Sequence, residues 1–346
     1  MSGGGRPRFS LAMLLDAPAD VIGDRARAAE ILGFDRVWLP DERLRRSVYV
    51  VLTACALKTE ALGLGVGVTN PFTRHPAVTA ASIASLEELR PSNVVLGIGA
   101  GGELSHLGLS AERPLPAVRG AIETIRRLTG GSSDEDPHDV APVGHRLEFG
   151  ERPSPIYVAS RGPRLLKLAG ELADGVIVGG FANVDAFRFA LRQVDSGISD
   201  AGRQPTDVRR VAWLYTSVDP VAERARAAVR PIVMASMMTS RRVLEDIGVQ
   251  LPERLRKELD GKGWKLSHPE LVEAAAQLDE ATVTAFSLAG DVGECAERLA
   301  GLMAEGLDEV AFVCFPSEGT SVMELSERIM GELVPAALAI AQRQQA

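Results

Sequence analysis

The residues best suited to chemistry stand where a glycine-rich run ends. From Leu62 to Pro76 the sequence reads LGLGVGVTNPFTRHP, in which apolar residues alternate with glycines up to the polar pair Thr69 and Asn70. This alternation predicts a buried strand with almost no side chains on one face. His75 comes just before Pro76, which opens an alanine-rich helix. Bare backbone beside polar groups and a helix N-terminus suits a flat ligand with an anionic tail, although the same glycines would also let a strand pack closely inside a barrel.

Two carboxylates follow the preceding apolar segment. Residues 36–39 predict a short strand, and Asp41 and Glu42 come directly after its end. Carboxyl groups at a strand end are candidates for general acid–base chemistry, although adjacent side chains point apart. His75 is a further candidate for proton transfer, and the alternative for it is a structural hydrogen bond. The candidate catalytic residues are therefore Asp41, Glu42, Asn70 and His75.

A second cluster predicts a site for an anion such as phosphate. Ser160, Arg161 and Gly162 stand between a predicted strand and a predicted helix, and Gly179 and Gly180 end the next strand. Backbone N–H groups at the start of a helix, together with an arginine, attract anions. The alternative is that the glycines are ordinary loop residues and the arginine is solvated.

The sequence argues against two other kinds of site, one for a dinucleotide and one for a metal ion. Gly97, Gly99 and Gly102 match the G-x-G-x-x-G pattern of dinucleotide-binding folds. That pattern should open a βαβ unit and precede a strand that ends in an acidic residue, whereas here it follows the fourth strand and the next strand ends in Ala159-Ser160. The five histidines lack the spacing of metal ligands, so we expect no metal site.

The elements that must position these residues alternate between strand and helix. The predicted strands cover residues 9–15, 36–39, 62–69, 93–98, 156–160, 176–178, 209–217 and 309–315. Such alternation indicates parallel strands with right-handed crossovers. An open doubly wound sheet would share the pattern, but barrels hold their chemistry at the carboxyl ends of the strands, where the unusual residues stand here. We therefore expect an α/β fold, a closed (β/α)8 TIM barrel with insertions.

Length and composition narrow the class of protein. We expect a single domain over residues 1–346, with a flexible tail at 1–7 and insertions at 130–155 and 240–282, the second being a candidate lid. The net charge of -8 argues against a nucleic acid or an anionic membrane surface as partner. No apolar run has the length of a signal peptide or a membrane helix, and the three cysteines are far apart. We expect a cytoplasmic protein that acts on a small molecule.

Four segments of the chain resemble the bacterial luciferase-like superfamily. They are GFDRVWLPDE from Gly33, GVGVTNPFTRHP from Gly65, LGIGAGG from Leu96 and PIYVASRGPRLLKLAGELADGVIVGG from Pro155. Within it the resemblance is to the branch that uses the deazaflavin coenzyme F420, typified by methylenetetrahydromethanopterin reductase. The resemblance implies a TIM-like barrel that holds F420 at the carboxyl ends of its strands. A hydride would then pass between the deazaflavin C5 and a substrate on its open face.

The resemblance also implies roles for single residues. A non-prolyl cis peptide, here Gly67-Val68, would press against the back of the ring, with Asp41, Thr69 and Asn70 near it. The residues implied at the phosphate end are Ala159, Ser160, Gly162, Gly179 and Gly180. The patterns described above add Gly99 and Arg161 to the candidate cofactor-binding residues.

Two departures from the resemblance leave the substrate open. Many relatives carry Asp-His after the second strand, where this chain has Asp41-Glu42, and the methanopterin reductases carry an acidic residue where this chain has Ala12. The first hypothesis is an F420-dependent oxidoreductase. The alternatives are an FMN-dependent monooxygenase of a two-component system and a coenzyme-binding protein without turnover. Because relatives of this kind are commonly dimers, we also expect a homodimer.

Overall fold

The computed structural model describes residues 6–42, 44–101, 104–130, 146–150 and 152–345. These residues fall into two compact units, which are described separately. Of the described residues, those within 8–177 and 193–210 form the N-terminal unit, and those within 6–7, 178–192 and 211–345 form the C-terminal unit. The single domain over residues 1–346 stays a prediction.

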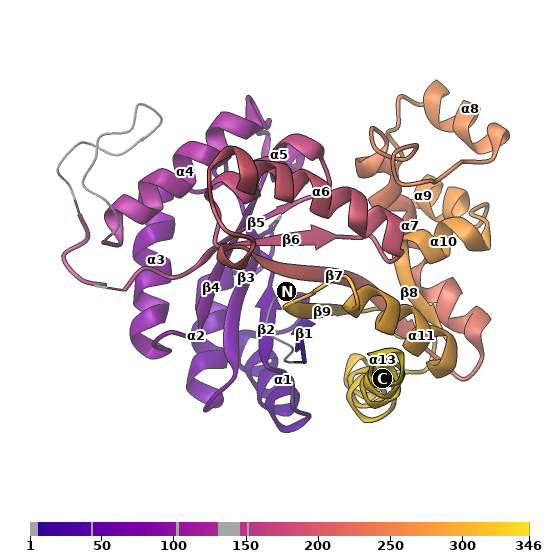
Figure 1. Ribbon diagram of the computed structural model, residues 1–346, viewed down its shortest axis with the longest axis horizontal. Coiled ribbons are helices and arrows are strands. Elements are labelled where there is room, and N and C mark those ends of the chain that lie inside the picture. The colour runs from indigo at the N-terminus through magenta and orange to yellow at the C-terminus, as the bar shows by residue number, and fades with distance from the viewer. Residues whose placement is uncertain (1–5, 43, 102–103, 131–145, 151, 346) are drawn as a thin grey trace. The chain divides into compact units, whose positions relative to one another are not determined.

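Parallel strands form the centre of the N-terminal unit (Figure 1). They are β1 (Arg8–Ala12), β2 (Arg36–Leu39), β3 (Gly63–Thr69), β4 (Val94–Gly99) and β5 (Ile156–Ser160). Each strand pairs in parallel with the next one along the chain. Their carboxyl ends therefore meet at one edge, which brings together the residues that follow them.

Helices connect these strands in the order that the sequence predicts. They are α1 (Ala19–Ile31), α2 (Val48–Lys58), α3 (Pro76–Leu89), α4 (Pro114–Leu128) and α5 (Pro163–Leu172). Each packs against the next, as parallel crossovers require. After α5, β6 (Gly175–Gly179) and α6 (Val184–Asp200) run from the N-terminal unit into the C-terminal unit and back.

The C-terminal unit is built on β7 (Arg209–Val218), which extends from the N-terminal unit. It pairs in parallel with β9 (Glu309–Cys314) and, through its second half, with β8 (Ser287–Gly290). The helices are α7 (Ala222–Ser240), α8 (Glu253–Gly261), α9 (His268–Ala275), α10 (Glu280–Phe286), α11 (Val292–Met303), α12 (Val322–Arg328) and α13 (Val334–Gln345). Strand and helix thus alternate through both units, as in a (β/α)8 barrel, with β8 as an added strand.

One strand was not predicted, and one local prediction is contradicted in part. The strand β8 was not expected, because the four residues SLAG are too few to show an alternating pattern. Pro231 was expected to kink or end its helix; the helix does not end there, since α7 continues to Ser240, and the kink stays a prediction. Buried residues on both sides of the proline, Val229 and Val233, anchor the helix and offset the lost backbone hydrogen bond.

The structure describes all of one predicted insertion and only a small part of the other. The 240–282 segment folds into helical pieces, α8, α9 and the start of α10, as expected. Most of the 130–155 segment, residues 131–145 and 151, lies outside the described residues. Among the residues that the structure describes, no helix combines the length and apolar character needed to cross a bilayer.

Candidate active site

The ends of β2 and β3 are joined by a polar cluster. Thr69 Oγ1 donates a hydrogen bond of 2.8 Å to Asp41 Oδ2, and Arg74 Nη2 lies 3.6 Å from Asp41 Oδ1. The parallel register of β2 and β3 places both strand ends at the same edge. We call Asp41, Thr69 and Arg74 the Asp41 cluster. The first two were predicted at the site, whereas the part played by Arg74 was not.

Tyr49 of α2 completes the surroundings of Arg74. The guanidinium carbon of Arg74 lies 4.9 Å from the centre of the Tyr49 ring, a cation–π contact. Burial, and then the charge of Asp41, raise the pKa of the Tyr49 phenol well above its usual value, although Arg74 opposes the shift. Tyr49 is therefore neutral at physiological pH. No sequence pattern pointed to Tyr49, because it contacts Arg74 only in the folded chain.

Arg74 also carries a buried N–H without a partner. Its Nε has no hydrogen-bond acceptor within the described part of the chain. A buried donor without an acceptor is unfavourable by about 1–3 kcal/mol. A ligand that brought an acceptor to this nitrogen would remove that cost.

Asn70 and His75 have local partners. Asn70 Oδ1 accepts hydrogen bonds of 3.0 Å from the backbone N–H groups of Phe72 and Thr73, so the amide oxygen shapes the loop after β3. The exposed His75 caps α3, its Nδ1 accepting from Ala77 N at 3.2 Å. This is the structural hydrogen bond that the sequence left open as the alternative for His75.

Glu42 differs from its neighbour Asp41. It is half-buried, and it forms no hydrogen bond or ion pair with another described residue. Of the two carboxylates, Asp41 is therefore held in place by hydrogen-bonding and ion-pair partners, and Glu42 is not.

The bare face of β3 is only partly available to a ligand. A Cβ added at Gly65 would lie 2.3 Å from the Trp38 ring, and one at Gly63 would lie 2.9 Å from Asn93 Oδ1. Trp38 is fully buried. Over Gly63 and Gly65 the expectation of a ligand on the bare backbone is therefore wrong, because the Trp38 indole fills the space at Gly65 and the Asn93 side chain lies close to Gly63. There the glycines allow close packing.

The end of β3 has the backbone that the resemblance implied. The Gly67-Val68 peptide bond is cis, and the register between β3 and β4 shifts between Val66 and Thr69. Val68 lies over the glycines of β4, since a Cβ added at Gly97 would be 2.8 Å from Val68 Cγ1 and one at Gly99 3.3 Å from its Cγ2. The repeated glycines of β4 thus make room for Val68, which accounts for them without a dinucleotide.

The loop after β5 has the features of an anion site. Ser160 Oγ accepts a hydrogen bond of 3.0 Å from Gly162 N, and Gly162 is the N-cap of α5. The first turn of a helix leaves N–H groups without intrahelical partners. A Cβ added at Gly162 would meet only Ser160 Oγ, at 3.8 Å, so the space beside this backbone is open. Ala159 and Arg161 are half-buried on either side of Ser160.

Gly179 and Gly180 belong to the C-terminal unit. A Cβ added at Gly179 would have no neighbour within 4 Å, and Gly180 has a φ of 73°, which favours glycine. Gly180 N donates to Trp213 O at 3.0 Å. Within the described ranges, no group of three or more histidines, cysteines or carboxylates is placed to hold a metal ion.

Comparison with known proteins assigns the chain to a protein family. The family model described as luciferase-like monooxygenase matches residues 7–309. The 5,10-methylenetetrahydromethanopterin reductase of Methanolobus tindarius is 32% identical over 306 residues, which are 87% of this chain and 92% of that protein. The F420-dependent hydroxymycolic acid dehydrogenase of Mycobacterium tuberculosis is 33% identical over 226 residues, 59% of this chain and 60% of that protein.

A solved structure supports the same assignment. The coenzyme F420 dependent tetrahydromethanopterin reductase from Methanopyrus kandleri matches with a TM-score of 0.82 at 27% identity, over 96% of this chain and 99% of that one. This likeness confirms the predicted α/β class and the (β/α)8 TIM barrel. The resemblance noted in the sequence is confirmed as well. The chain belongs to the luciferase-like monooxygenase family.

Proposed function

We propose that the chain is an F420-dependent oxidoreductase that transfers a hydride between C5 of the deazaflavin and a small organic substrate. Two of the proteins compared above are named as F420-dependent, a dehydrogenase and a reductase, which supports this coenzyme. The observation in this chain that carries the proposal is the Asp41 cluster at the carboxyl ends of β2 and β3. We expect the enzyme to work in the cytoplasm.

The residues present fit such a coenzyme at both of its ends. At the ring end, Arg74 Nε is a buried donor without an acceptor among the described residues, as a site for a polar heterocycle requires. At the phosphate end, the open space beside Gly162 and the start of α5 suit an anion. Asp41, Thr69 and Asn70 would hold the ring, and the backbone from Ser160 to Gly162 would hold the phosphate. Gly67, Val68, Gly99, Ala159 and Arg161 would line the same region of the N-terminal unit.

Different residues of the chain would bind the coenzyme and transfer the proton. When bound, the deazaflavin supplies the carbon that accepts or donates the hydride. Asp41 has one oxygen bonded to Thr69 and the other facing Arg74, so it serves as a fixed hydrogen-bond acceptor. Glu42, which forms no hydrogen bond or ion pair with another described residue, moves the proton that accompanies the hydride at the substrate. His75 remains a catalytic candidate through its other ring nitrogen, since its Nδ1 caps α3.

Binding of the coenzyme tests the proposal directly. We expect F420 to bind more tightly than FMN when the protein is titrated with each and the ligand fluorescence is followed. Replacing Arg74 by Gln removes the charge beside Asp41 and should raise the Kd for F420 about tenfold or more. The control is Arg45→Gln, which removes an exposed arginine from the loop after β2. Tight binding of FMN with none of F420 would overturn the proposal.

One observation favours a second candidate function. The matching family model is described as a monooxygenase, so an FMN-dependent monooxygenase is the alternative. It predicts oxygen uptake when reduced FMN and an organic substrate are supplied together. Affinity for F420 without hydride exchange to any acceptor would instead favour a coenzyme-binding protein without turnover.

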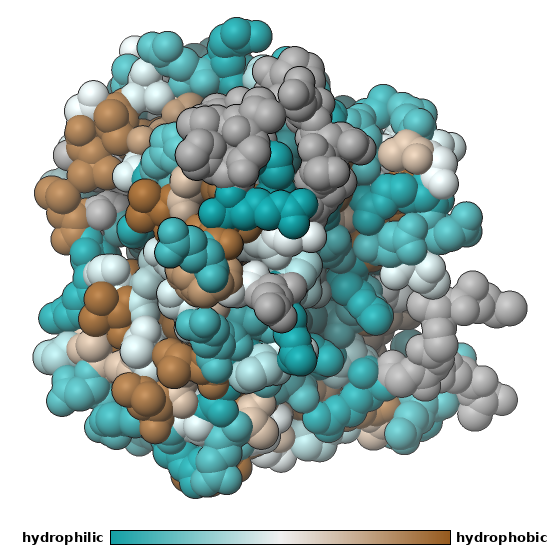
Figure 2. All heavy atoms as spheres, turned by 90° about the vertical axis from the view of Figure 1, so that its left-hand side faces the viewer, coloured by the Kyte–Doolittle hydropathy of each residue, from teal (hydrophilic) through white to brown (hydrophobic). Residues whose placement is uncertain are grey.

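We also propose that the protein is a homodimer, joined through the outer faces of α2 and α3. Val50 and Leu57 on α2 are 62% and 74% exposed, and Val78 on α3 is 51% exposed. The half-buried positions beside them, Thr53 and Ala54 on α2 and Ala81 on α3, are small and uncharged. Figure 2 shows apolar atoms gathered on this side of the N-terminal unit.

A second copy of the chain is the partner that this face fits. Residues 48–57 and 76–86 carry no charge, although 24% of the chain is charged. Uncharged faces of this kind mark interaction sites. Because α2 and α3 pack against each other, their small and aliphatic side chains form one continuous surface, which packs against its own copy about a two-fold axis.

A further inference from the structure

A pocket in the C-terminal unit lies between the start of α6, the loop after α7 and the helix α10. We call it the α10 pocket, and its volume is about 590 Å³. None of the residues assigned above to the coenzyme, the proton or the dimer lines it. The residues that line it are Asn183, 248–250, 279–282, 284 and 285, all within one compact unit.

The charges along the α10 pocket argue against an anion as its ligand. Asp279 and Glu280 line the pocket, and no lysine, arginine or histidine is among the described residues that do so. Two N–H groups at the start of α10 are already engaged, because Thr282 N and Val283 N both donate to Asp279. An anion in the pocket would therefore meet two carboxylates and no lining cation.

The same two acids are only partly open to a cation. Glu280 Oε1 lies 3.0 Å from Arg226 Nη2, which balances its charge. Asp279 Oδ1 accepts a hydrogen bond of 2.8 Å from Thr282 N and caps α10, whose N-terminus carries a partial positive charge. The second oxygen of each carboxylate can still accept hydrogen bonds. The acids thus favour neutral O–H donors over a full positive charge.

Neutral polar groups of the α10 pocket lack partners in the described chain. Thr282 is 3% exposed, and its hydroxyl forms no hydrogen bond with another described residue. The same holds for the hydroxyl of the half-buried Thr284. Asn183 Oδ1 accepts from Ala186 N at 2.7 Å, whereas the Asn183 NH2 group has no acceptor among the described residues. Polar groups as buried as Thr282 usually have a partner, which a ligand in this pocket would supply.

The walls of the α10 pocket are fixed to each other. Arg298 of α11 donates through Nη2 to Ala182 O at 3.2 Å and to Thr284 O at 2.6 Å. These carbonyls belong to the segment before α6 and to α10. Ala182 N also donates to Ala285 O at 2.9 Å. The polar groups of Asn183 and Thr284 are therefore held in place before a ligand arrives, which lowers the entropic cost of binding.

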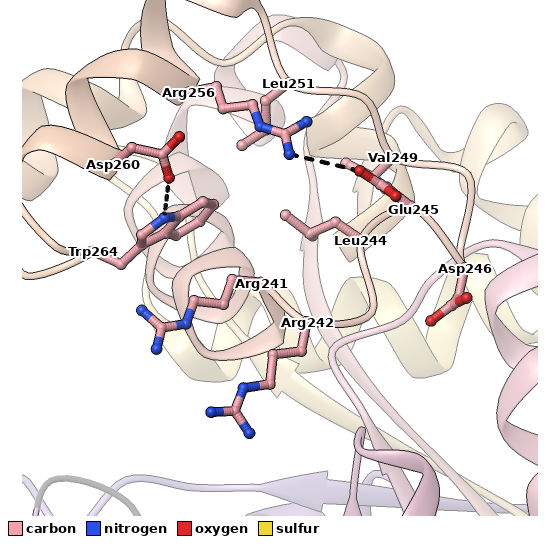
Figure 3. A pocket seen from close by; sticks show the side chains of 10 residues that line it. All are labelled: Arg241, Arg242, Leu244, Glu245, Asp246, Val249, Leu251, Arg256, Asp260 and Trp264. Carbon is pink, nitrogen blue, oxygen red and sulfur yellow. Dashed lines mark hydrogen bonds and ion pairs between the residues drawn. The ribbon is translucent and has the colours of Figure 1, made fainter.

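A second pocket of the same unit shares Val249 with the α10 pocket (Figure 3). Three arginines and three acids line this second pocket, and Arg256 Nη2 lies 3.6 Å from Glu245 Oε1. Such a mixture of charges selects neither an anion nor a cation. The α10 pocket differs from it, because its charged lining residues are both acids.

We propose that the α10 pocket binds an uncharged polyhydroxy compound, such as a free sugar or a cyclic polyol. Hydroxyl groups of the ligand donate to the open oxygens of the two carboxylates and accept from the Asn183 amide. The two threonine hydroxyls can donate or accept in turn. The aliphatic part of the lining, which contacts the C–H groups of the ligand, is Val249, Ala281 and Ala285.

Saturation-transfer nuclear magnetic resonance of the whole protein tests the proposal. The probes are D-galactose, maltose and myo-inositol, and we expect at least one of them to bind saturably. Thr282→Val removes the buried hydroxyl and should raise the Kd of that probe about fivefold or more. Because the hydroxyl has no partner within the described chain, this variant should be at least as stable to heat as the unaltered protein. Ala281→Leu, at an exposed position, narrows the pocket and should weaken the same probe.

The control variant is Thr239→Val, at an exposed position of α7 that does not line the pocket. Its affinity for the probe should equal that of the unaltered chain. If none of the three probes binds saturably, or if either pocket variant binds as tightly as this control, the proposal is overturned.

Charged counterparts of galactose test the expected selectivity. We expect galacturonate, the anionic counterpart, to show no binding that depends on Thr282. Galactosamine, the cationic counterpart, should bind no more tightly than galactose. The opposite result for either compound would mean that charge selects the ligand, and the proposal would fail. None of these measurements needs the coenzyme, so their outcome is independent of the function proposed above.

Discussion

Two adjacent carboxylates, Asp41 and Glu42, have opposite surroundings. Asp41 accepts a hydrogen bond from Thr69 and faces Arg74, whereas Glu42 has neither kind of partner among the described residues. A carboxylate whose oxygens are engaged binds and orients, and a free one exchanges protons. Replacing each residue by its amide should therefore impair a different property of the enzyme, turnover for Glu42 and coenzyme binding for Asp41.

We expect Glu42→Gln to lower kcat with any substrate that supports turnover, by roughly 10²-fold or more, while the Kd for F420 stays within about twofold. Asp41→Asn should instead raise the Kd for F420, because the amide cannot pair with Arg74 in the same way. Steady-state kinetics and fluorescence titration separate the two effects. If Glu42→Gln keeps full kcat, the proton is handled by another group.

At the scale of elements, the close contact between β2 and β3 depends on Gly65. A Cβ at this position would lie 2.3 Å from Trp38 Cε3, inside the core. We expect Gly65→Ala to lower the free energy of unfolding by about 1–3 kcal/mol or more, because overpacking forces the neighbours apart. Urea unfolding measures the change. In a Trp38→Leu background the same substitution should lower the free energy of unfolding by much less.

The matched control for this substitution is Gly261→Ala at the end of α8. Its added Cβ would have no neighbour within 4 Å. The free energy of unfolding should stay the same or rise slightly, since alanine favours the helix. An equal loss in both variants would mean that Trp38 does not limit the space at Gly65.

A buried carboxylate holds the end of β7 to the segment after β9. Asp219 is 3% exposed and accepts hydrogen bonds from Ser317 Oγ and from Val221 N. The hydrogen bond from Ser317 lowers the pKa of Asp219, against the opposing effect of burial. Asp219 therefore stabilises the folded chain above the pKa of the unfolded state, 3.8, and this contribution is lost as the pH falls through the lower folded value.

Replacing Ser317 by Ala should raise the folded pKa of Asp219 towards its usual value. At about pH 7 we expect a loss of about 1–3 kcal/mol in the free energy of unfolding, and the loss should become smaller as the pH falls below 3.8 and through the lower folded pKa of Asp219. Urea unfolding over a series of pH values from neutral to acid measures this. Ser199→Ala, at an exposed position of α6, is the control, and a loss independent of pH would contradict the role given to Asp219.

The sequence predicted the elements better than their contacts. The alternation of glycines marked β3, and the parallel order of strands was enough to expect Asp41 near Thr69. The contact of Tyr49 with Arg74 could not be predicted, because it depends on how the residues of α2 and the loop before α3 pack. For the same reason, nothing in the sequence indicated that Trp38 covers Gly65. The four residues of β8 were too short to show a pattern.

At the scale of the molecule, association between copies of the chain depends more on where the charged residues lie than on the net charge. The net charge of -8 keeps protein molecules apart in general, yet residues 48–57 and 76–86 contribute none of it. Association through α2 and α3 is therefore not opposed by charges on those segments. A single charge introduced into those segments should weaken the dimer far more than the same charge elsewhere on the surface.

We expect Leu57→Glu and Val78→Glu each to convert a dimer into a monomer, because a carboxylate buried between two copies loses its water without gaining a partner. Light scattering coupled to size-exclusion chromatography at micromolar concentration measures the mass. The control is Val272→Glu on α9 of the C-terminal unit, where an apolar residue is also exposed, by 46%. Because Leu57 and Val78 are exposed in one chain, both variants should fold, and F420 binding should confirm it. A dimer that survives both substitutions must use another surface.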